Sequence, residues 1–166
     1  MEHAVIETKP FDTKSSIEKA TNEQDNASKW QLRADGKTYT WRNTIERMEI
    51  IRNGIPYESL EVISRRLNRP IKAVLFIIGI PQTTYNHKKS KHALMNNRDS
   101  ELAVMITELL DFGIDVFNQE EEKFQRWLKK PNISLGQNPP ETLLDTITGI
   151  QEVQYGLNRL EYGNLA

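Results

Sequence analysis

The stretch that decides the fold runs from Ile71 to Lys89 and reads IKAVLFIIGIPQTTYNHKK. Its first half is an apolar helix pattern that starts after Pro70, and its second half is a short polar helix. Gly79 supplies the turn between them, because glycine adopts backbone conformations that other residues avoid. The pattern predicts a helix–turn–helix whose first helix, apolar nearly all round, is the buried centre of its domain. The residues expected where the two helices cross are Val74, Ile78, Ile80 and Tyr85.

The second helix of this unit presents polar side chains that suit DNA. Glutamine and asparagine pair with the edges of adenine, threonine contacts base edges, and lysine suits the phosphates that position such a helix. The predicted DNA-contacting residues are Gln82, Thr83, Asn86, His87, Lys88, Lys89 and Lys91. Leu75 stands at the fifth position of the first helix, where a small residue commonly allows close packing. An ordinary helical corner with Tyr85 in its core is the alternative.

The charges of the chain are segregated although they nearly cancel. The 166 residues hold 22 basic and 23 acidic side chains, a net charge of -1. Residues 62–98 carry 8 basic and no acidic side chains, whereas residues 1–61 have a net charge of -2 and residues 99–166 a net charge of -7. Such a basic block is typical of a phosphate-binding surface, although a solvated face balanced by acidic ends carries the same charges.

Composition excludes several classes of protein. The chain has no cysteine, which excludes disulfide scaffolds and thiolate zinc sites and fits a cytoplasmic location. No apolar run reaches the roughly 18 residues that span a bilayer, and no secretory signal is visible. The three histidines, His3, His87 and His92, form no catalytic or metal-binding pattern. We therefore expect a protein that is not an enzyme and has no cofactor and no bound metal.

The N-terminal residues 1–40 are expected to form a variable arm. Residues 1–29 are polar and cannot bury enough surface to offset the entropy of ordering, so this part is predicted to be mobile and partly disordered. Apolar residues alternate on both sides of an Asp-Gly turn, which predicts a short β-hairpin. The turn is Asp35-Gly36, and the alternating residues are Trp30, Leu32, Tyr39 and Trp41.

Helical spacing dominates the rest of the chain. An apolar stripe of Ile45, Met48 and Ile51 predicts a helix that begins at Thr44 and stops at Gly54. The further helices expected are Pro56 to Asn68, a long helix capped by Asn97 and reaching Phe117, a helix from Asn118 with Glu121 in a capping box, a short helix after Pro139-Pro140, and Thr148 to Tyr162 with Gly163 as its cap. Gly149 and Gly156 indicate close approach of another backbone, within the chain or from a partner.

Four sequence pieces follow one another in the C-terminal part of the chain. They are Trp127-Leu128, then Pro131-Asn132-Ile133-Ser134-Leu135-Gly136, then Pro140-Glu141-Thr142-Leu143-Leu144-Asp145-Thr146, and finally Arg159-Leu160-Glu161-Tyr162-Gly163. In this order and spacing they resemble the toxin-binding domain of the Xre/MbcA/ParS type of antitoxin. Residues 45–117 also look like the Xre-like helix–turn–helix half of these proteins, whereas residues 1–40 have no counterpart.

The resemblance implies an antitoxin of a type II toxin–antitoxin system. The implied partners are a cognate toxin, usually a RES-domain enzyme that consumes NAD, and operator DNA, through which the protein represses its own operon. In this family the C-terminal segment occludes the toxin's active-site cleft, and here that segment is Asn158 to Ala166. The toxin-binding residues implied are Asn158, Arg159, Glu161, Tyr162 and Gly163. A homodimer is expected, because operator half-sites favour two-fold symmetry.

The expected fold is all-α, with a helix–turn–helix domain over residues 41–117 and a small helical toxin-binding domain over residues 118–166. Two other interpretations remain open at this stage. The first is a stand-alone transcription regulator whose C-terminal half only forms dimers or senses a ligand. The second is a protein-interaction module that does not touch DNA, for which Leu75 and the acidic flanks argue.

Overall fold

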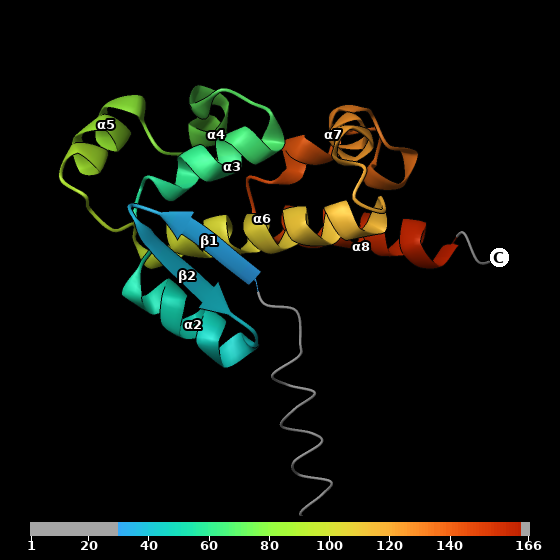
Figure 1. The fold of residues 1–166 in the computed structure, drawn as a ribbon. Helices are drawn as coiled ribbons and strands as arrows, with labels where there is room; N and C mark the ends of the chain where they lie inside the picture. The colour runs from blue at the N-terminus through green and yellow to red at the C-terminus, as the bar shows by residue number, and fades with distance from the viewer. Residues whose placement is uncertain (1–29, 164–166) are drawn as a thin grey trace, which may run out of the picture.

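The computed structural model describes residues 30–163 and has the predicted all-α fold with a short N-terminal hairpin (Figure 1). The predicted mobile arm of residues 1–29 lies outside the described residues. The elements in chain order are β1 (Trp30–Ala34), β2 (Lys37–Trp41), α2 (Thr44–Asn53), α3 (Ser59–Leu67), α4 (Ile71–Ile78), α5 (Gln82–Ser90), α6 (Asn97–Val116), α7 (Glu121–Lys129), the 3-10 turns η1 (Ile133–Leu135) and η2 (Pro140–Leu143), and α8 (Ile147–Gly163).

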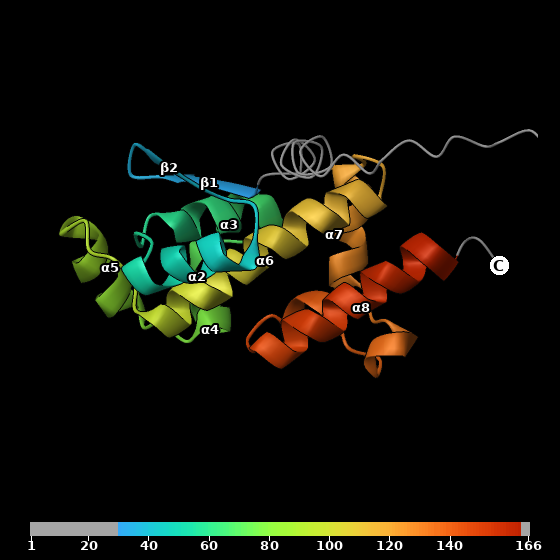
Figure 2. The ribbon, with the colours of Figure 1, turned by 90° about the horizontal axis from the view of Figure 1, so that it is seen from below.

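The long helix α6 lies at the centre of the molecule. It packs against β1, α2 and α3 on one side and against α7 and α8 on the other (Figures 1 and 2). Its buried apolar side chains are Leu102, Ala103, Val104, Ile106, Leu109 and Leu110. The prediction that α4 is the buried centre was therefore wrong, because α4 lies at the periphery and Phe76 on it is 88% exposed. An all-apolar segment is peripheral here because only one of its faces meets the core.

The predicted hairpin forms and belongs to the core of the helix–turn–helix half. Strands β1 and β2 are antiparallel, and Asp35 and Gly36 at the turn both have positive φ, as a tight Asp-Gly turn requires. Leu32 and Trp41 are fully buried. The Trp41 indole Nε1 donates a hydrogen bond of 2.6 Å to Oε1 of Glu108 on α6, so a polar contact also holds the hairpin against that helix.

Three predictions for helix starts were wrong. Helix α3 starts at Ser59 and not at Pro56, which forms a β-bridge with Leu94. The cap of α6 is Asn96 and not Asn97, because the Asn96 side chain accepts a hydrogen bond from the backbone N–H of Asp99. The predicted capping box at Asn118 does not form. Asn118 has a positive φ, which places it in a turn, and α7 starts without a side-chain cap.

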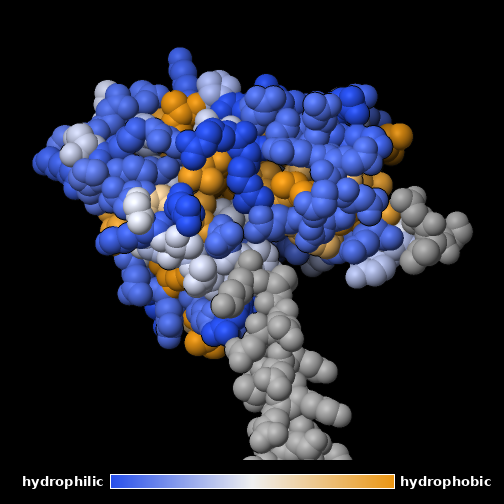
Figure 3. Space-filling model, in the orientation of Figure 1, coloured by the Kyte–Doolittle hydropathy of each residue, from blue (hydrophilic) through white to orange (hydrophobic). Residues whose placement is uncertain are grey.

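The apolar stripe of α2 is only partly covered, because Ile51 packs against the core whereas Ile45 and Met48 do not. Ile45 is 65% exposed, Met48 is also exposed, and no residue of α2 is buried. Apolar surface is visible at the lower edge of Figure 3, where Figure 1 places α2. Ile50 and Ile51 pack partly buried against the core, and the Asn43 cap and an ion pair of 2.9 Å between Arg47 and Glu108 also hold the helix.

The C-terminal module packs around two glycines of α8. A Cβ at Gly149 would overlap the backbone oxygen of Leu143, so η2 and α8 touch through their backbones. Gly156 is buried and would place a Cβ 3.7–3.8 Å from the side chains of Trp127 and Leu135. The close approach inferred from these glycines is therefore internal to the chain, and it is a backbone contact only at Gly149.

Among residues 30–163, none of the helices combines the length and the apolar character that spanning a membrane requires.

Gly149→Ala is expected to lower the free energy of unfolding by about 1–3 kcal/mol, because the new methyl group meets fixed backbone rather than a flexible side chain. Gly156→Ala is the matched control. Its methyl group fits at ordinary contact distance, and alanine favours the helix by about 1 kcal/mol over glycine, so this variant is expected to be neutral or more stable. Urea denaturation of the two variants measures the difference, and equal stabilities would contradict the packing described.

Candidate functional site

The α4–α5 corner has the predicted helix–turn–helix geometry. Gly79 adopts a left-handed conformation with φ 82°, and the N–H groups of Gly79 and Ile80 both donate to the carbonyl oxygen of Leu75 at 2.9 Å. This pair of hydrogen bonds turns the chain sharply before Pro81, after which α5 begins. The four residues expected at the helix crossing are all buried: Val74, Ile78, Ile80 and Tyr85.

Tyr85 anchors α5 to the rest of the helix–turn–helix half. Its ring lies 6.4 Å from the ring of Tyr57, and its hydroxyl group donates a hydrogen bond of 3.2 Å to Oε1 of Glu61 on α3. Burial, together with the neighbouring Glu61 charge, raises the pKa of Tyr85 far above its usual value. Lys89 also pairs with Glu61, and its ammonium group lies 5.9 Å from the Tyr85 ring centre. The inner face of α5 is thus fixed by both apolar and polar contacts.

The outer face of α5 is open to solvent. Of the seven residues predicted to contact DNA, Lys89 alone is half-buried and ion-paired. Gln82 and Asn86 are linked by a hydrogen bond of 3.0 Å from Gln82 Nε2 to Asn86 Oδ1, so these two amides lie side by side at adjacent turns. The exposed members are Gln82, Thr83, Asn86, His87, Lys88 and Lys91. The structure therefore exposes six of the seven predicted residues on α5 and just after it, and these six are called the α5 face.

The basic block is less available for phosphate than its formal charge indicates. Four of its eight cations pair with acidic side chains, all of which lie outside the block in sequence. The pairs are Arg66–Asp111, Arg69–Glu141, Lys89–Glu61 and Arg98–Asp99. Within residues 30–163, the cations of the block that form no ion pair are Arg65, Lys72, Lys88 and Lys91. Two of these four, Lys88 and Lys91, belong to the α5 face.

One ion pair joins the two halves of the chain. The guanidinium of Arg69, just before α4, donates two hydrogen bonds to the carboxylate of Glu141 in η2. The hydrogen bonds to Glu141 raise the pKa of Arg69, and the Glu141 side chain is 11% exposed. The sequence analysis did not identify this pair. The two residues are far apart in sequence, and no local pattern couples them.

The last turns of α8 form the second exposed surface. Val153 and Leu157 are fully buried and hold the helix against the module, whereas Arg159, Glu161 and Tyr162 are exposed and Asn158 is half-buried. Tyr162 is 67% exposed. The segment predicted to reach a toxin continues to Ala166, but residues 164–166 lie outside the described part of the chain. We call the exposed residues Arg159, Glu161, Tyr162 and Gly163 the α8 end.

The two exposed surfaces lie at opposite ends of the molecule. Figure 1 shows α5 at one end and the C-terminus beyond α8 at the other, with α6 between them. Figure 2 shows the same separation from below. Large partners can therefore occupy the α5 face and the α8 end at the same time.

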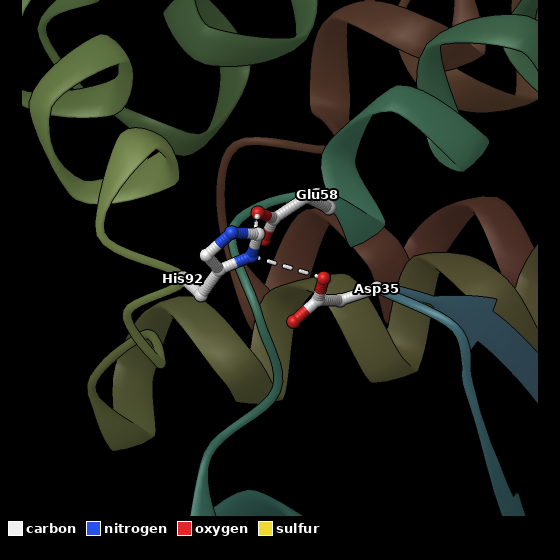
Figure 4. Close-up of side chains that lie close together, drawn as sticks. All are labelled: Asp35, Glu58 and His92. Atoms are coloured by element: carbon white, nitrogen blue, oxygen red, sulfur yellow. Dashed lines mark hydrogen bonds and ion pairs between the residues drawn. The ribbon is translucent and has the colours of Figure 1, made fainter.

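Sequence reasoning also missed a group of titratable side chains beside α5. Asp35, Glu58 and His92 come from three different segments and lie close together (Figure 4). Because they are widely spaced in the sequence, only the tertiary fold shows that they meet. No local sequence motif joins them.

Comparison with known proteins identifies the C-terminal part of the chain. Residues 113–163 match the family model of the antitoxin Xre/MbcA/ParS C-terminal toxin-binding domain. The chain is 27% identical over 114 residues to an "Antitoxin Xre" of Photorhabdus laumondii, with 69% of this chain and 77% of that relative covered. It is 26% identical over 116 residues to an "Antitoxin Xre" of Yersinia enterocolitica, with 70% and 78% covered.

Both of these relatives are antitoxins, and the matched family model is that of an antitoxin's toxin-binding domain. The findings therefore support an antitoxin of the Xre/MbcA/ParS type, in agreement with the resemblance stated from the sequence. The match covers α7, η1, η2 and α8, and it includes the α8 end. A cognate toxin is therefore the partner that this domain indicates.

Glu61→Gln is expected to destabilise the protein by about 0.5 kcal/mol at pH 7, the size typical of a partly exposed ion pair. The hydrogen bond from Lys89 lowers the pKa of Glu61 below its ordinary 4.5. The stabilisation is therefore complete above about pH 4.5 and disappears at lower pH, as the folded carboxylate takes up a proton. Denaturant unfolding at several pH values tests this, with the exposed Glu49→Gln as control. If Glu61→Gln were less stable than the parent protein by the same amount at pH 3 as at pH 7, this prediction would be contradicted.

Proposed function

We propose that the protein neutralises a RES-type, NAD-consuming toxin by placing its C-terminal segment, Asn158–Ala166, in the toxin's active-site cleft. The observation that carries this proposal is the α8 end, which belongs to a toxin-binding domain and presents exposed Arg159 and Tyr162 beyond a buried anchor. Tyrosine and arginine are among the side chains that most often dominate binding energy at protein interfaces. Arginine at the α8 end also suits the phosphates of a bound dinucleotide.

We further propose that the α5 face binds operator DNA and that this binding represses the operon. Gln82 and Asn86 carry exposed amides of the kind that pair with adenine edges, and Lys88 and Lys91 are exposed without an ion-pair partner in the described chain. Lys89 is assigned a different role here. It positions α5 through Glu61, although a phosphate within reach could still share its ammonium group.

The proposed assembly is a homodimer bound to a two-fold operator, with one toxin on each α8 end. The separation of the α5 face from the α8 end along α6 supports this arrangement, because a toxin at one end does not cover the other (Figure 1). The alternative function is a stand-alone helix–turn–helix regulator whose C-terminal half only forms dimers. It is favoured by the exposed apolar groups of α2, which could serve a dimer contact without any toxin.

Removal of residues 158–166 is expected to abolish toxin neutralisation and to leave DNA binding intact. The measurement is growth rescue during co-expression with the cognate toxin, sought as a RES-type reading frame beside the gene. Arg159→Ala and Tyr162→Ala replace exposed side chains only, and each is expected to weaken toxin binding by about 1.4–3 kcal/mol. Glu152→Ala, exposed on an earlier turn of α8, is the control. Full neutralisation by the truncated protein would overturn the occlusion proposal.

Replacing Lys88 and Lys91 by alanine is expected to weaken binding to all duplex DNA and to flatten its salt dependence. The slope of log K against log salt should become shallower by about 0.9 for each phosphate that the variant no longer neutralises. A control with the same change in charge is Lys123→Ala with Lys130→Ala, which removes two cations of the C-terminal module. Equal slopes for the two double variants would show that the protein contacts phosphate elsewhere on its surface.

A further inference from the structure

Three side chains beside α5 converge on a single point (Figure 4). Asp35 stands at the turn of the hairpin, Glu58 just before α3, and His92 in the link between α5 and α6. The ring atom Nδ1 of His92 lies 3.0 Å from Oδ1 of Asp35 and 3.4 Å from Oε1 of Glu58. One ligand atom from each of the three residues lies within 4.8 Å of the other two.

Hydrogen bonds among Asp35, Glu58 and His92 do not satisfy all of their polar atoms. Nδ1 of His92 carries at most one hydrogen, yet it faces two carboxylates, so a single N–H is shared between Asp35 and Glu58. The second oxygen of Glu58, Oε2, is buried and has no hydrogen-bond partner among the described residues. A buried carboxylate oxygen without a partner is costly, since it has given up its water and gained nothing in exchange.

No basic side chain in the described part of the chain neutralises these two carboxylates. Asp35 and Glu58 pair with His92, and no lysine or arginine of residues 30–163 pairs with either of them. Lys89 lines the same hollow but pairs with Glu61. The resulting negative potential acts on Tyr39, whose pKa is raised by burial and further by the charges of Asp35 and Glu58. The group therefore lacks positive charge.

We propose that Asp35, Glu58 and His92 form a binding site for a divalent transition-metal cation, with Zn²⁺ as its representative. Zinc binds imidazole nitrogen and carboxylate oxygen at about 2.0–2.2 Å, so neighbouring ligand atoms on one ion are about 3.0–3.5 Å apart. The two distances from Nδ1 of His92, 3.0 and 3.4 Å, fall in this range. A bound cation would replace the single hydrogen that the two carboxylates share, and it would coordinate an oxygen of each. Bidentate ligation by Glu58 would give its Oε2 a partner.

The choice of metal follows from the ligand types. An imidazole ligand favours Zn²⁺ and similar ions over Mg²⁺, which prefers oxygen ligands alone and keeps most of its waters. Three protein ligands on an exposed rim leave the remaining positions to water. The site would tie the hairpin turn, the entry to α3 and the exit of α5 together, and it would thereby fix the end of α5 (Figure 4).

Isothermal titration of the full-length, tag-free protein with Zn²⁺ tests the proposal. The chain also holds His3 and His87, so the titration uses a His3→Ala background, and His87→Ala serves as the matched histidine control. We expect one Zn²⁺ per chain, much weaker binding of Mg²⁺, and affinity for Zn²⁺ that falls by at least about tenfold in His92→Ala and in Glu58→Gln. The His87→Ala variant should bind as tightly as its parent.

A second readout separates loss of the site from loss of the fold. Saturating Zn²⁺ should raise the melting temperature of the parent and of His87→Ala, because a ligand that binds the folded state stabilises it. It should leave the melting temperature of His92→Ala unchanged, and circular dichroism of that variant should match the parent. The proposal is overturned by an absence of Zn²⁺ binding, by undiminished binding in His92→Ala, or by loss of binding in His87→Ala.

Discussion

Burial of α6 against both halves of the chain is the constraint on which the rest of the structure depends. The helix is 20 residues long, and its buried side chains belong to the core beneath the hairpin as well as to the core of the C-terminal module. Each fully buried leucine or isoleucine contributes about 1.5–3 kcal/mol, so the shared apolar core binds the two halves firmly together. The α5 face and the α8 end are then held apart along the length of this helix.

Charged side chains, like the apolar core, connect parts of the chain that are distant in sequence. The basic block and the acidic flanks look like separate functional surfaces when the chain is read in order, but ion pairs use half of the block's cations, three of them across the fold. Arg69 and Glu141 even join the helix–turn–helix half to the toxin-binding module. What remains exposed near α5 is a smaller positive surface that contains Lys88 and Lys91. Electrostatic pairing within the chain thus sets how much charge is left for a partner.

Much of the local structure was predictable, and the errors have physical causes. The hairpin at Asp35-Gly36, the Gly79 turn and all the helices of residues 44–163 follow from turn chemistry and from apolar spacing, which act over a few residues. The burial of α4 was mispredicted, because apolar spacing shows which face could be buried but not whether another element covers it. Phe76 and Ile45 lie on such uncovered surfaces. The cap at Asn96 rather than Asn97 depended on the backbone conformation of a single residue.

The sequence by itself determined the class of protein, because four motif pieces in order are specific and the toxin-binding family match at residues 113–163 agrees with them. It also determined that Gln82, Thr83, Asn86 and His87 of α5 point outward, since helical periodicity follows from the chain alone. Tertiary structure decided which charges are already paired, why Gly149 must be small, and that Asp35, Glu58 and His92 meet beside α5. Those outcomes depend on contacts between residues distant in sequence, and chain order carries no signal for them until the core around α6 has formed.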